Sequence, residues 1–281
     1  MPRPTICGQY ERRPGSCAGG HINRREMMKL RILGCSGGIG GNARTTSMLL
    51  DHDVLIDAGT GVGDLSLSEL SLIDHVFITH SHLDHIACIP LLVDSVGFMR
   101  EQPLTVHATE ATLEIIARHV FNGEIWPDFS RIPDERQPFM RYHAIGLGEA
   151  AELGARRITA LPAKHAVPAV GFQIDSGTAS LVFSGDTTTN DALWEVVNGI
   201  GNLRYLIVET AFSNADQELA VLSGHFCPAM LADDLLKLRL APEIYITHLK
   251  PGEADLIMRE VGECVHGFAP KMLRNGQVFE F

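Results

Sequence analysis

Thr79-His80-Ser81-His82-Leu83-Asp84-His85 is the most informative stretch of this sequence, because it places three imidazoles and a carboxylate directly after an apolar segment. Alternate side chains at the end of a β-strand point to the same side, so His80 and His82 would face one metal ion. Asp84 and His85 would follow at the turn into a helix, where they could face a second ion. Neutral imidazole and carboxylate suit zinc, manganese or iron. The alternative is a surface cluster of unpaired polar groups.

Three more polar residues each follow an apolar segment and enter a turn, as expected for side chains gathered at one edge of a sheet. They are His165 in Leu161-Pro-Ala-Lys-His, Asp186 in Phe183-Ser-Gly-Asp and His248 in Ile246-Thr-His. Each of them alone would more often be a surface residue than a ligand. Together with the first cluster they supply five histidines and two aspartates, enough for a site that holds two metal ions.

Short apolar segments bounded by turn residues recur along the chain and predict strands. The expected strands are Leu30–Leu33, Thr46–Leu50, Val54–Ile56, Val76–Thr79, Arg157–Ala160, Val170–Ile174, Ser180–Phe183, Tyr205–Val208 and Ile244–Thr247. The expected helices are Asp84–Arg100, Glu110–Phe121, Ala192–Val197, Pro228–Leu238 and Glu253–Val261. Because strands and helices are interspersed, the pattern favours a layered α/β domain.

The beginning of the chain differs in composition from the rest. Residues 1–27 are rich in proline, glycine and arginine, which predicts a flexible extension that precedes a folded domain over residues 28–281. This extension could lie upstream of a natural start at Met27 or Met28, and an organellar transit peptide is the alternative. Residues 122–140 contain three prolines and predict an inserted loop.

Charge and cysteine usage limit the possible partners. The net charge is −11, with +5 over residues 1–31 and −16 over the remainder. Because an acidic body repels polyanions, a long nucleic acid is disfavoured as a substrate. No apolar run is long enough to span a membrane. The six cysteines form no CxxC pair and no secretory framework, which favours reduced thiols and a cytoplasmic location.

The glycine-rich segment 34–41, Gly-Cys-Ser-Gly-Gly-Ile-Gly-Gly, invites comparison with nucleotide-binding loops. No register of it gives G-x-G-x-x-G, and no Lys-Ser/Thr follows at the spacing of a P-loop. We therefore expect a tight turn between two strands, which requires the conformational freedom of glycine. A turn placed beside a metal site could still bring main-chain N–H groups near an anion.

The H-x-H-x-D-H motif at residues 80–85 resembles that of the metallo-β-lactamase superfamily, whose fold is a four-layer αββα sandwich. The resemblance extends over most of residues 29–281. It implies two ligand groups and one bridging residue, which are His80, His82 and His165 for one metal ion, Asp84, His85 and His248 for the other, and Asp186 between them. Asp57, in Leu55-Ile-Asp-Ala-Gly, matches an early aspartate of the superfamily that orients a ligand histidine.

Two positions distinguish between branches of the superfamily. Lactamases often carry cysteine at the bridging position, where this chain has Asp186. Oxygen-reducing di-iron members typically carry glutamate where this chain has His82. Both branches therefore lose support.

Three features are similar to class II cyclic-nucleotide phosphodiesterases. Leu83 completes an H-x-H-L-D-H form, Ile246-Thr-His-Leu-Lys-Pro resembles the final ligand segment, and Ser223-Gly-His-Phe-Cys-Pro resembles the His-x-x-Pro segment. Glu209-Thr-Ala-Phe precedes the last of these, as in the related ribonuclease Z branch. Phe226-Cys227 departs from the Leu-Thr pair that is usual in class II, so the substrate stays open.

The resemblance implies hydrolysis of 3′,5′-cyclic nucleotides of the cyclic AMP type. Two divalent metal ions, Zn²⁺ or alternatively Mn²⁺ or Fe²⁺, would generate a hydroxide that attacks phosphorus. Asp84 and His225 are the expected catalytic residues. By resemblance to ribonuclease Z, His225 would protonate the leaving ribose oxygen or clamp the phosphate. A merely packed histidine is the alternative for His225.

The implied partner is a small anionic phosphodiester, with no membrane and no long nucleic acid, and a homodimer is left open. Rival functions are ribonuclease Z-like RNA processing, hydrolysis of a lactone or thioester, and non-catalytic metal binding. Glu124–Phe129 could form a base-stacking wall, although a core-covering loop or a dimer contact is the favoured interpretation. Lys250 could contact phosphate or be solvated. The histidines without an assigned role are His21, His52, His75, His107, His119, His143 and His266.

Overall fold

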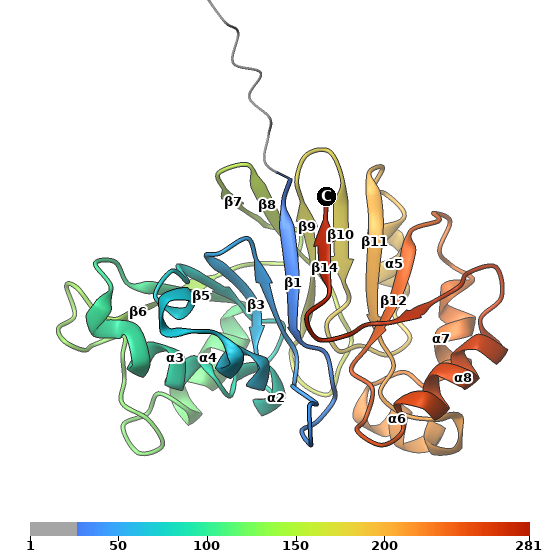
Figure 1. Cartoon of the computed structure of the whole chain (residues 1–281), viewed down its shortest axis with the longest axis horizontal. Helices are drawn as coiled ribbons and strands as arrows, with labels where there is room; N and C mark the ends of the chain where they lie inside the picture. The colour runs from blue at the N-terminus through green and yellow to red at the C-terminus, as the bar shows by residue number, and fades with distance from the viewer. Residues whose placement is uncertain (1–26) are drawn as a thin grey trace, which may run out of the picture.

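The computed structural model describes residues 27–281, so the extension expected over residues 1–27 lies, except for Met27, outside the described residues. Two seven-stranded sheets face each other, with helices on their outer sides (Figure 1). Their strand orders are β14-β1-β2-β3-β4-β5-β6 and β13-β12-β11-β10-β9-β8-β7. None of the helices within residues 27–281 combines the length and the apolar character that crossing a membrane requires.

The strands and helices have the following bounds. The first sheet contains β1 (Lys29–Gly34), β2 (Ser47–Leu50), β3 (Val54–Ala58), β4 (His75–Phe77), β5 (Leu104–Ala108), β6 (Met140–Ala144) and β14 (Val278–Glu280). The second contains β7 (Ala150–Leu153), β8 (Arg156–Pro162), β9 (Val170–Asp175), β10 (Ser180–Phe183), β11 (Leu203–Glu209), β12 (Glu243–Thr247) and β13 (Lys271–Met272). The helices are α1 (Leu67–Leu70), α2 (Leu83–Ile86), α3 (Ile89–Val96), α4 (Glu110–His119), α5 (Asp191–Val197), α6 (Gln217–Ser223), α7 (Pro228–Leu235) and α8 (Ala254–Cys264), with short 3₁₀ turns η1 (Thr60–Asp64), η2 (Gly97–Met99) and η3 (Asn214–Asp216).

Strand alternation produces the four layers. In β3, Val54 and Ile56 belong to the core between the two sheets, whereas Leu55 belongs to the core under α3 and α4. In β10, Leu181 faces the first sheet and Val182 faces the core that α5, α7 and α8 cover. Central strands such as β3 and β10 are thus buried on both sides, which explains their predominantly apolar sequences. The expected αββα sandwich is confirmed.

Parallel strands determine where the site lies. Strands β3 to β6 run parallel in the first sheet, and β10 to β13 run parallel in the second. The carboxyl ends of parallel strands meet at one edge of a sheet, and ligands of open α/β sheets bind beyond those ends. The segments that follow β4, β10 and β12 therefore meet at a common edge of the sandwich.

The single helix expected over Asp84–Arg100 is wrong, because this region forms α2, α3 and η2. The break falls at Cys88, whose backbone N–H donates to the carbonyl oxygen of Ala58 at 2.9 Å rather than continuing the helix. Pro90 then occupies the first turn of α3, where its missing N–H costs nothing. The break leaves α2 as a single turn that presents Asp84 and His85 beside β3.

Residues 122–139 contain no helix or strand, and β6 begins at Met140. Phe129 is 5% exposed and belongs to the outer core of the first half, and Trp126 packs against the same core. These aromatic side chains are therefore engaged in packing, which agrees with the core-covering interpretation rather than with a base-stacking wall.

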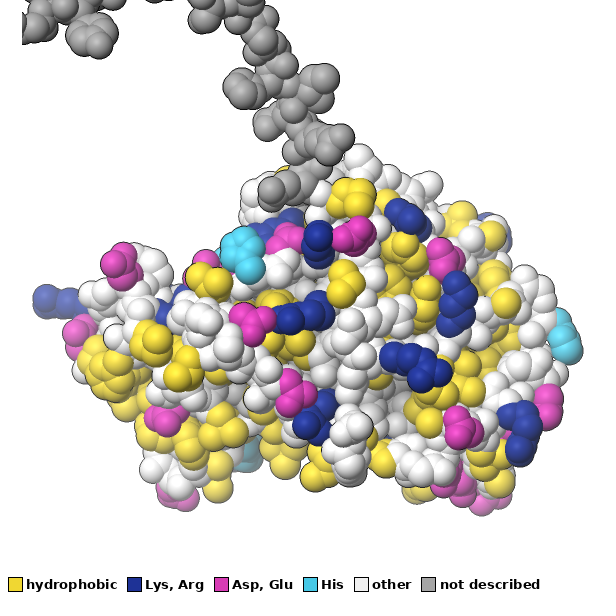
Figure 2. Space-filling view, viewed as in Figure 1, with side chains coloured by type: hydrophobic (Ala, Val, Ile, Leu, Met, Phe, Trp, Pro, Cys, Tyr) yellow, Lys and Arg dark blue, Asp and Glu magenta, His cyan; other side chains and the backbone are white. Residues whose placement is uncertain are grey.

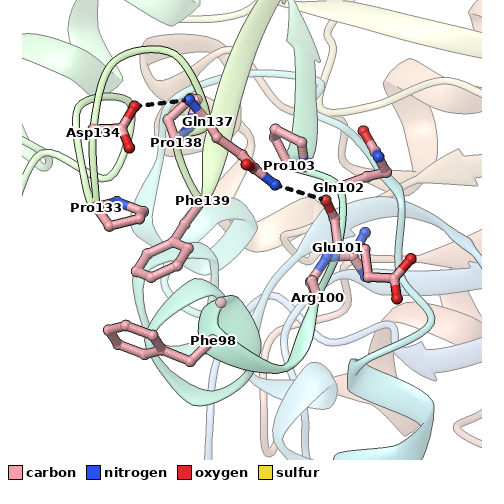
Figure 3. Close-up of a pocket in the computed structure, with 11 residues that line it drawn as sticks. Phe98, Arg100, Glu101, Gln102, Pro103, Pro133, Asp134, Gln137, Pro138 and Phe139 are labelled. Atoms are coloured by element: carbon pink, nitrogen blue, oxygen red, sulfur yellow. Dashed lines mark hydrogen bonds between the residues drawn. The ribbon is translucent and has the colours of Figure 1, made fainter.

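The end of this segment meets η2 around a hollow of about 260 Å³ (Figure 3). The Phe139 ring lies edge-on to the Phe98 ring with centroids 4.5 Å apart, and the Gln137 side-chain amide donates to the Glu101 carbonyl oxygen at 3.2 Å. These contacts attach the segment to the first half of the sandwich, at the end of β5 away from the edge where β4, β10 and β12 end.

His107, in β5, is buried between the two sheets. Its Nε2 lies 3.0 Å from Nδ1 of His75, and its ring stacks on Phe77 with centroids 4.3 Å apart. Burial, with smaller contributions from His75 and His143, lowers the pKa of His107 to about 3. The His107 imidazole is therefore neutral in the folded protein at neutral pH.

We expect the His107→Phe variant to lose stability less steeply than the wild type as the pH falls from about 6.5 towards 3. The unfolded chain binds a proton at His107 near pH 6.5 whereas the folded chain does not, so this residue lowers the unfolding free energy by up to ~1.4 kcal/mol per pH unit in that window. Urea denaturation of chelator-treated protein at several pH values measures the difference between the two slopes. Parallel curves would contradict the prediction.

Candidate metal centre

The structure brings all seven predicted ligand residues together at one edge of the sandwich. His80 and His82 lie in the connection from β4 to α2, and Asp84 and His85 lie in α2 itself. The other three follow strand ends of the second sheet, and they are His165 after β8, Asp186 after β10 and His248 after β12. The sandwich thus places residues from both sheets opposite one another.

The first group consists of His80, His82 and His165. One nitrogen from each of the three imidazoles lies within 4.8 Å of the others. Nε2 of His165 is 3.1 Å from Nδ1 of His82, and the rings of His80 and His82 are nearly perpendicular, with centroids 4.7 Å apart. This group could hold one ion through three nitrogen ligands.

The second group consists of Asp84, His85 and His248. Oδ2 of Asp84 lies 3.8 Å from Nε2 of His85 and 3.7 Å from Nε2 of His248. All three ligand atoms lie within 4.8 Å of one another, so this group could hold a second ion with mixed nitrogen and oxygen ligands.

Asp186 lies between the two groups. Its Oδ2 is 3.6 Å from Nε2 of His80 in the first group and 3.3 Å from Nε2 of His85 in the second. Its Oδ1 is 3.4 Å from Nδ1 of His248. Burial alone would raise the pKa of Asp186, but His248, His85 and His80 hold it well below its usual range. Asp186 is therefore a carboxylate that both groups share.

Unpaired buried atoms test whether metal ions fit here. Nε2 of His80, Nε2 of His85, Nδ1 of His248 and Oδ1 of Asp186 are buried and have no hydrogen-bond partner among residues 27–281. An unsatisfied buried polar group costs about 1–3 kcal/mol, so four of them in one cluster would be unfavourable without a ligand. All four are nitrogen or oxygen atoms of the types that coordinate divalent ions. The residues present therefore fit divalent metal ions.

Asp57, at the end of β3, orients His85. Its Oδ2 lies 2.7 Å from Nδ1 of His85, and its Oδ1 accepts the backbone N–H of Thr79 at 2.8 Å. A carboxylate can only accept, so Nδ1 of His85 carries a proton and Nε2 is the nitrogen that is left to bind a metal ion. Asp57 has φ +55°, and a non-glycine residue in this left-handed region is typical of strain kept at a functional site.

The segment Cys35–Gly37, which we name the glycine strap, holds His248 from the other side. The backbone N–H of His248 donates to the Cys35 carbonyl oxygen at 2.8 Å, and that of Gly37 donates to the Leu249 carbonyl oxygen at 3.0 Å. His248 has φ +64°, which these bonds maintain. The expected tight turn is found farther along, where Gly41 has φ +54° and Ala43 donates to the Gly40 carbonyl oxygen.

We expect Gly37→Ala to displace His248 and to remove about one of two metal ions. A Cβ at residue 37 would lie 2.5 Å from the carbonyl oxygen of His248, closer than real Cβ atoms approach a backbone oxygen, and 3.0 Å from Cδ2 of the same residue, which is a tight contact. Elemental analysis after dialysis against zinc measures the bound metal per chain. Gly201→Ala is the control, because a Cβ there meets nothing within 4 Å. Full metal content in Gly37→Ala would contradict a role of the strap.

His225 joins the centre from the turn before α7 and has a partner that the sequence did not reveal. Its Nδ1 lies 2.7 Å from Oε1 of Glu209, a fully buried residue at the end of β11 whose Oε1 also accepts the Thr187 N–H at 3.1 Å. One His225 nitrogen lies within 4.8 Å of ligand atoms of His165 and Asp186. Burial would lower the pKa of His225, but the charge and hydrogen bond of Glu209 raise it.

Lys250 is fixed rather than freely solvated. Its Nζ donates to the Gly37 carbonyl oxygen at 2.9 Å and lies 5.5 Å from the centroid of the Phe212 ring. The remaining histidines of the described chain lie outside the four groups of ligand atoms, and they are His52, His75, His107, His119, His143 and His266. His21 lies outside the described residues.

The sequence of this chain is similar to one protein family and to several curated proteins. Residues 52–263 match the family model described as "Beta-lactamase superfamily domain". A Yersinia pestis protein named "Probable 3′,5′-cyclic-nucleotide phosphodiesterase" is 25% identical over 205 residues, which cover 64% of this chain and 57% of that protein. A ribonuclease BN of Escherichia coli is 27% identical over 160 residues, covering 53% of this chain and 50% of that protein. The chain thus spans about half the length of these relatives.

Solved structures show the same fold over nearly the whole chain. A metallo-β-lactamase fold protein from Bacillus subtilis, YhfI, has a TM-score of 0.73 at 23% identity, covering 92% of this chain and 100% of that chain. Unliganded yeast PDE1 has a TM-score of 0.77 at 17% identity, covering 91% and 100%. The short form of human tRNase Z has a TM-score of 0.64 at 18% identity, covering 89% and 98%.

Proposed function

Because the chain belongs to the metallo-β-lactamase superfamily of metal-dependent hydrolases, we propose that it is a dinuclear phosphodiesterase that cleaves small 3′,5′-cyclic nucleotides. The observation that carries the proposal is the pairing of His225 with Glu209 beside the cluster of seven ligand residues. Hydrolysis of a phosphodiester releases an alkoxide, which is a poor leaving group and therefore needs a proton donor. A histidine held by a carboxylate and directed at the cluster supplies that proton.

In this proposal, His80, His82 and His165 hold one ion, Asp84, His85 and His248 hold the other, and Asp186 is shared between them. When bound, two divalent ions supply Lewis acidity towards phosphoryl oxygens and a water molecule of lowered pKa.

Side chains around this site orient the ligands and transfer the proton. Asp57 keeps His85 in the tautomer that can bind metal. Glu209 holds the proton of His225 on Nδ1 in the neutral form and stabilises the imidazolium, whose Nε2 proton passes to the leaving ribose oxygen.

The test is chromatography of 3′,5′-cyclic AMP after incubation with zinc- or manganese-loaded protein, with chelator-treated protein and Asp84→Ala as controls. Appearance of AMP that requires both metal and Asp84 is the expected result. Absence of product from protein that is shown to contain two metal ions per chain would refute the cyclic AMP proposal. Lactone and thioester substrates assayed with the same preparation would then identify another ester class, and no turnover at all would favour a non-catalytic metal-binding protein.

Ribonuclease activity is the second candidate, because the ribonuclease BN of Escherichia coli matches over 160 residues. The charge of this chain argues against it. Acidic and basic side chains are interspersed on the face shown in Figure 2, where they do not gather into one basic surface of the kind that binds long RNA. A transfer RNA precursor with a 3′ extension, assayed beside cyclic AMP, separates the two functions.

A further inference from the structure

A hollow of about 610 Å³ adjoins the candidate metal centre on the side of α4. Its walls come from Thr109 and Ala111 at the beginning of α4, from Leu147, and from residues 163–170, which connect β8 to the first residue of β9. His165 belongs both to this wall and to the first ligand group. A substrate whose phosphate lies at the cluster can therefore extend directly into the hollow.

The lining of the hollow differs from the rest of this acidic protein. Eight of its eleven lining residues are apolar, the other three are Thr109, Lys164 and His165, and none of the eleven is acidic. With a net charge of −11 on the chain, a wall without carboxylates beside a site for divalent cations is suited to an anionic ligand with an apolar body. The volume lies within the usual range for small-molecule sites, which is about 300–1,000 Å³.

Hydrogen bonds hold the two walls in place. The Thr112 hydroxyl of α4 donates to the Pro168 carbonyl oxygen at 3.4 Å, which links the helix to the segment between β8 and β9. The backbone N–H of Lys164 donates to Oγ1 of Thr187 at 3.0 Å, and the carbonyl oxygen of Lys164 accepts from Thr188 at 2.9 Å. The hollow is thus formed before any ligand binds, which lowers the entropic cost of binding.

We propose that this hollow, which we name the nucleoside pocket, holds the base of a mononucleotide phosphodiester, the part of the substrate that does not react, and accepts different bases without strong preference. The inference rests on the proposed phosphodiesterase function. No aromatic ring of the usual stacking type lines the pocket, and besides His165 only Thr109 and Lys164 offer polar side chains to a base edge. Apolar pockets discriminate weakly between ligands of similar shape. Cyclic AMP and cyclic GMP are therefore turned over with kcat/KM values within about tenfold of each other.

The test fills the pocket from an exposed position. Ala111→Trp places an indole in the pocket from the second residue of α4, and Ala192→Trp is the matched control at the exposed second residue of α5. Titration calorimetry with AMP on the zinc-loaded protein needs no turnover. We expect Ala111→Trp to weaken AMP binding at least tenfold and to leave inorganic phosphate binding unchanged, while the control keeps both affinities.

A second filling variant guards against an indirect effect. Leu147→Trp reaches the pocket from another wall, from a side chain that is 63% exposed and contributes little to the core. The same tenfold loss of AMP binding with retained phosphate binding is expected, together with a KM for cyclic AMP that rises while kcat stays near that of the wild type. Wild-type AMP affinity in both variants, or a preference of more than 100-fold between the two purines, would overturn the pocket. If AMP binds as expected but no cyclic nucleotide is hydrolysed, the pocket stands and the phosphodiesterase proposal fails.

Discussion

Asp186→Asn is expected to lose at least one of two metal ions and to lower kcat/KM by at least about 10³. Asp186 is 2% exposed, and its two carboxylate oxygens lie within 3.6 Å of nitrogens of His80, His85 and His248. The amide has the same shape but no charge, and its NH2 end has no lone pair to offer a metal ion. Metal-ion catalysis contributes several kcal/mol, and each 1.36 kcal/mol corresponds to a factor of ten in rate.

The measurement combines elemental analysis with steady-state kinetics of the same preparation. Asp233→Asn, an exposed position in α7, is the control for the loss of one negative charge. The four unpaired atoms of the cluster destabilise the metal-free fold, so bound zinc should stabilise the protein. Added zinc should therefore raise the melting temperature of the wild type and of Asp233→Asn much more than that of Asp186→Asn. Two tightly bound metal ions and wild-type turnover in Asp186→Asn would show that the carboxylate is not shared between them.

The ligand cluster could be predicted from sequence because four of its members lie within residues 80–85. A strand followed by a turn allows few directions for these side chains, so local geometry decides their convergence. His165, Asp186 and His248 are distant in sequence, but each follows an apolar strand, and parallel strands end at one edge. The αββα layers follow from the same pattern, since central strands that are apolar on both faces require cover on both faces.

The contacts that support the site could not be predicted in this way. Cys35 and His248 are joined by a hydrogen bond across more than 200 residues, and nothing near either residue in sequence indicates the other. The helix break at Cys88 depends on a carbonyl oxygen of β3. Strands β5 and β6 were missed because His107 and Arg141 interrupt their apolar pattern, and the short β14 is defined only by its pairing with β1.

Glu209 shows that a motif can identify a residue without predicting which side chain it contacts. Glu209-Thr-Ala-Phe marked the residue as part of a known arrangement, but its side chain contact with His225 emerges only from the fold. Glu209 is fully buried, and its oxygens accept from Thr187 and His225. Burying a carboxylate is costly unless it is paired and hydrogen-bonded. The pairing with Glu209 therefore also fixes the position of the His225 ring. Glu209 is therefore a positioning residue for His225.

His225→Ala is expected to lower kcat for cyclic AMP by about 10²–10³, the contribution typical of general acid catalysis. The loss should depend on the leaving group. Nitrophenolate departs without protonation, so hydrolysis of bis(p-nitrophenyl) phosphate should fall by less than about tenfold in the same variant. Glu209→Gln should show the same dependence with a smaller loss, about 10-fold to 100-fold for cyclic AMP, because the amide still orients the imidazole but does not stabilise its cation. Elemental analysis must show unchanged metal content in both variants. Equal losses for the two substrates would show instead that His225 binds the phosphate, because a clamp on phosphoryl oxygens acts whatever group departs.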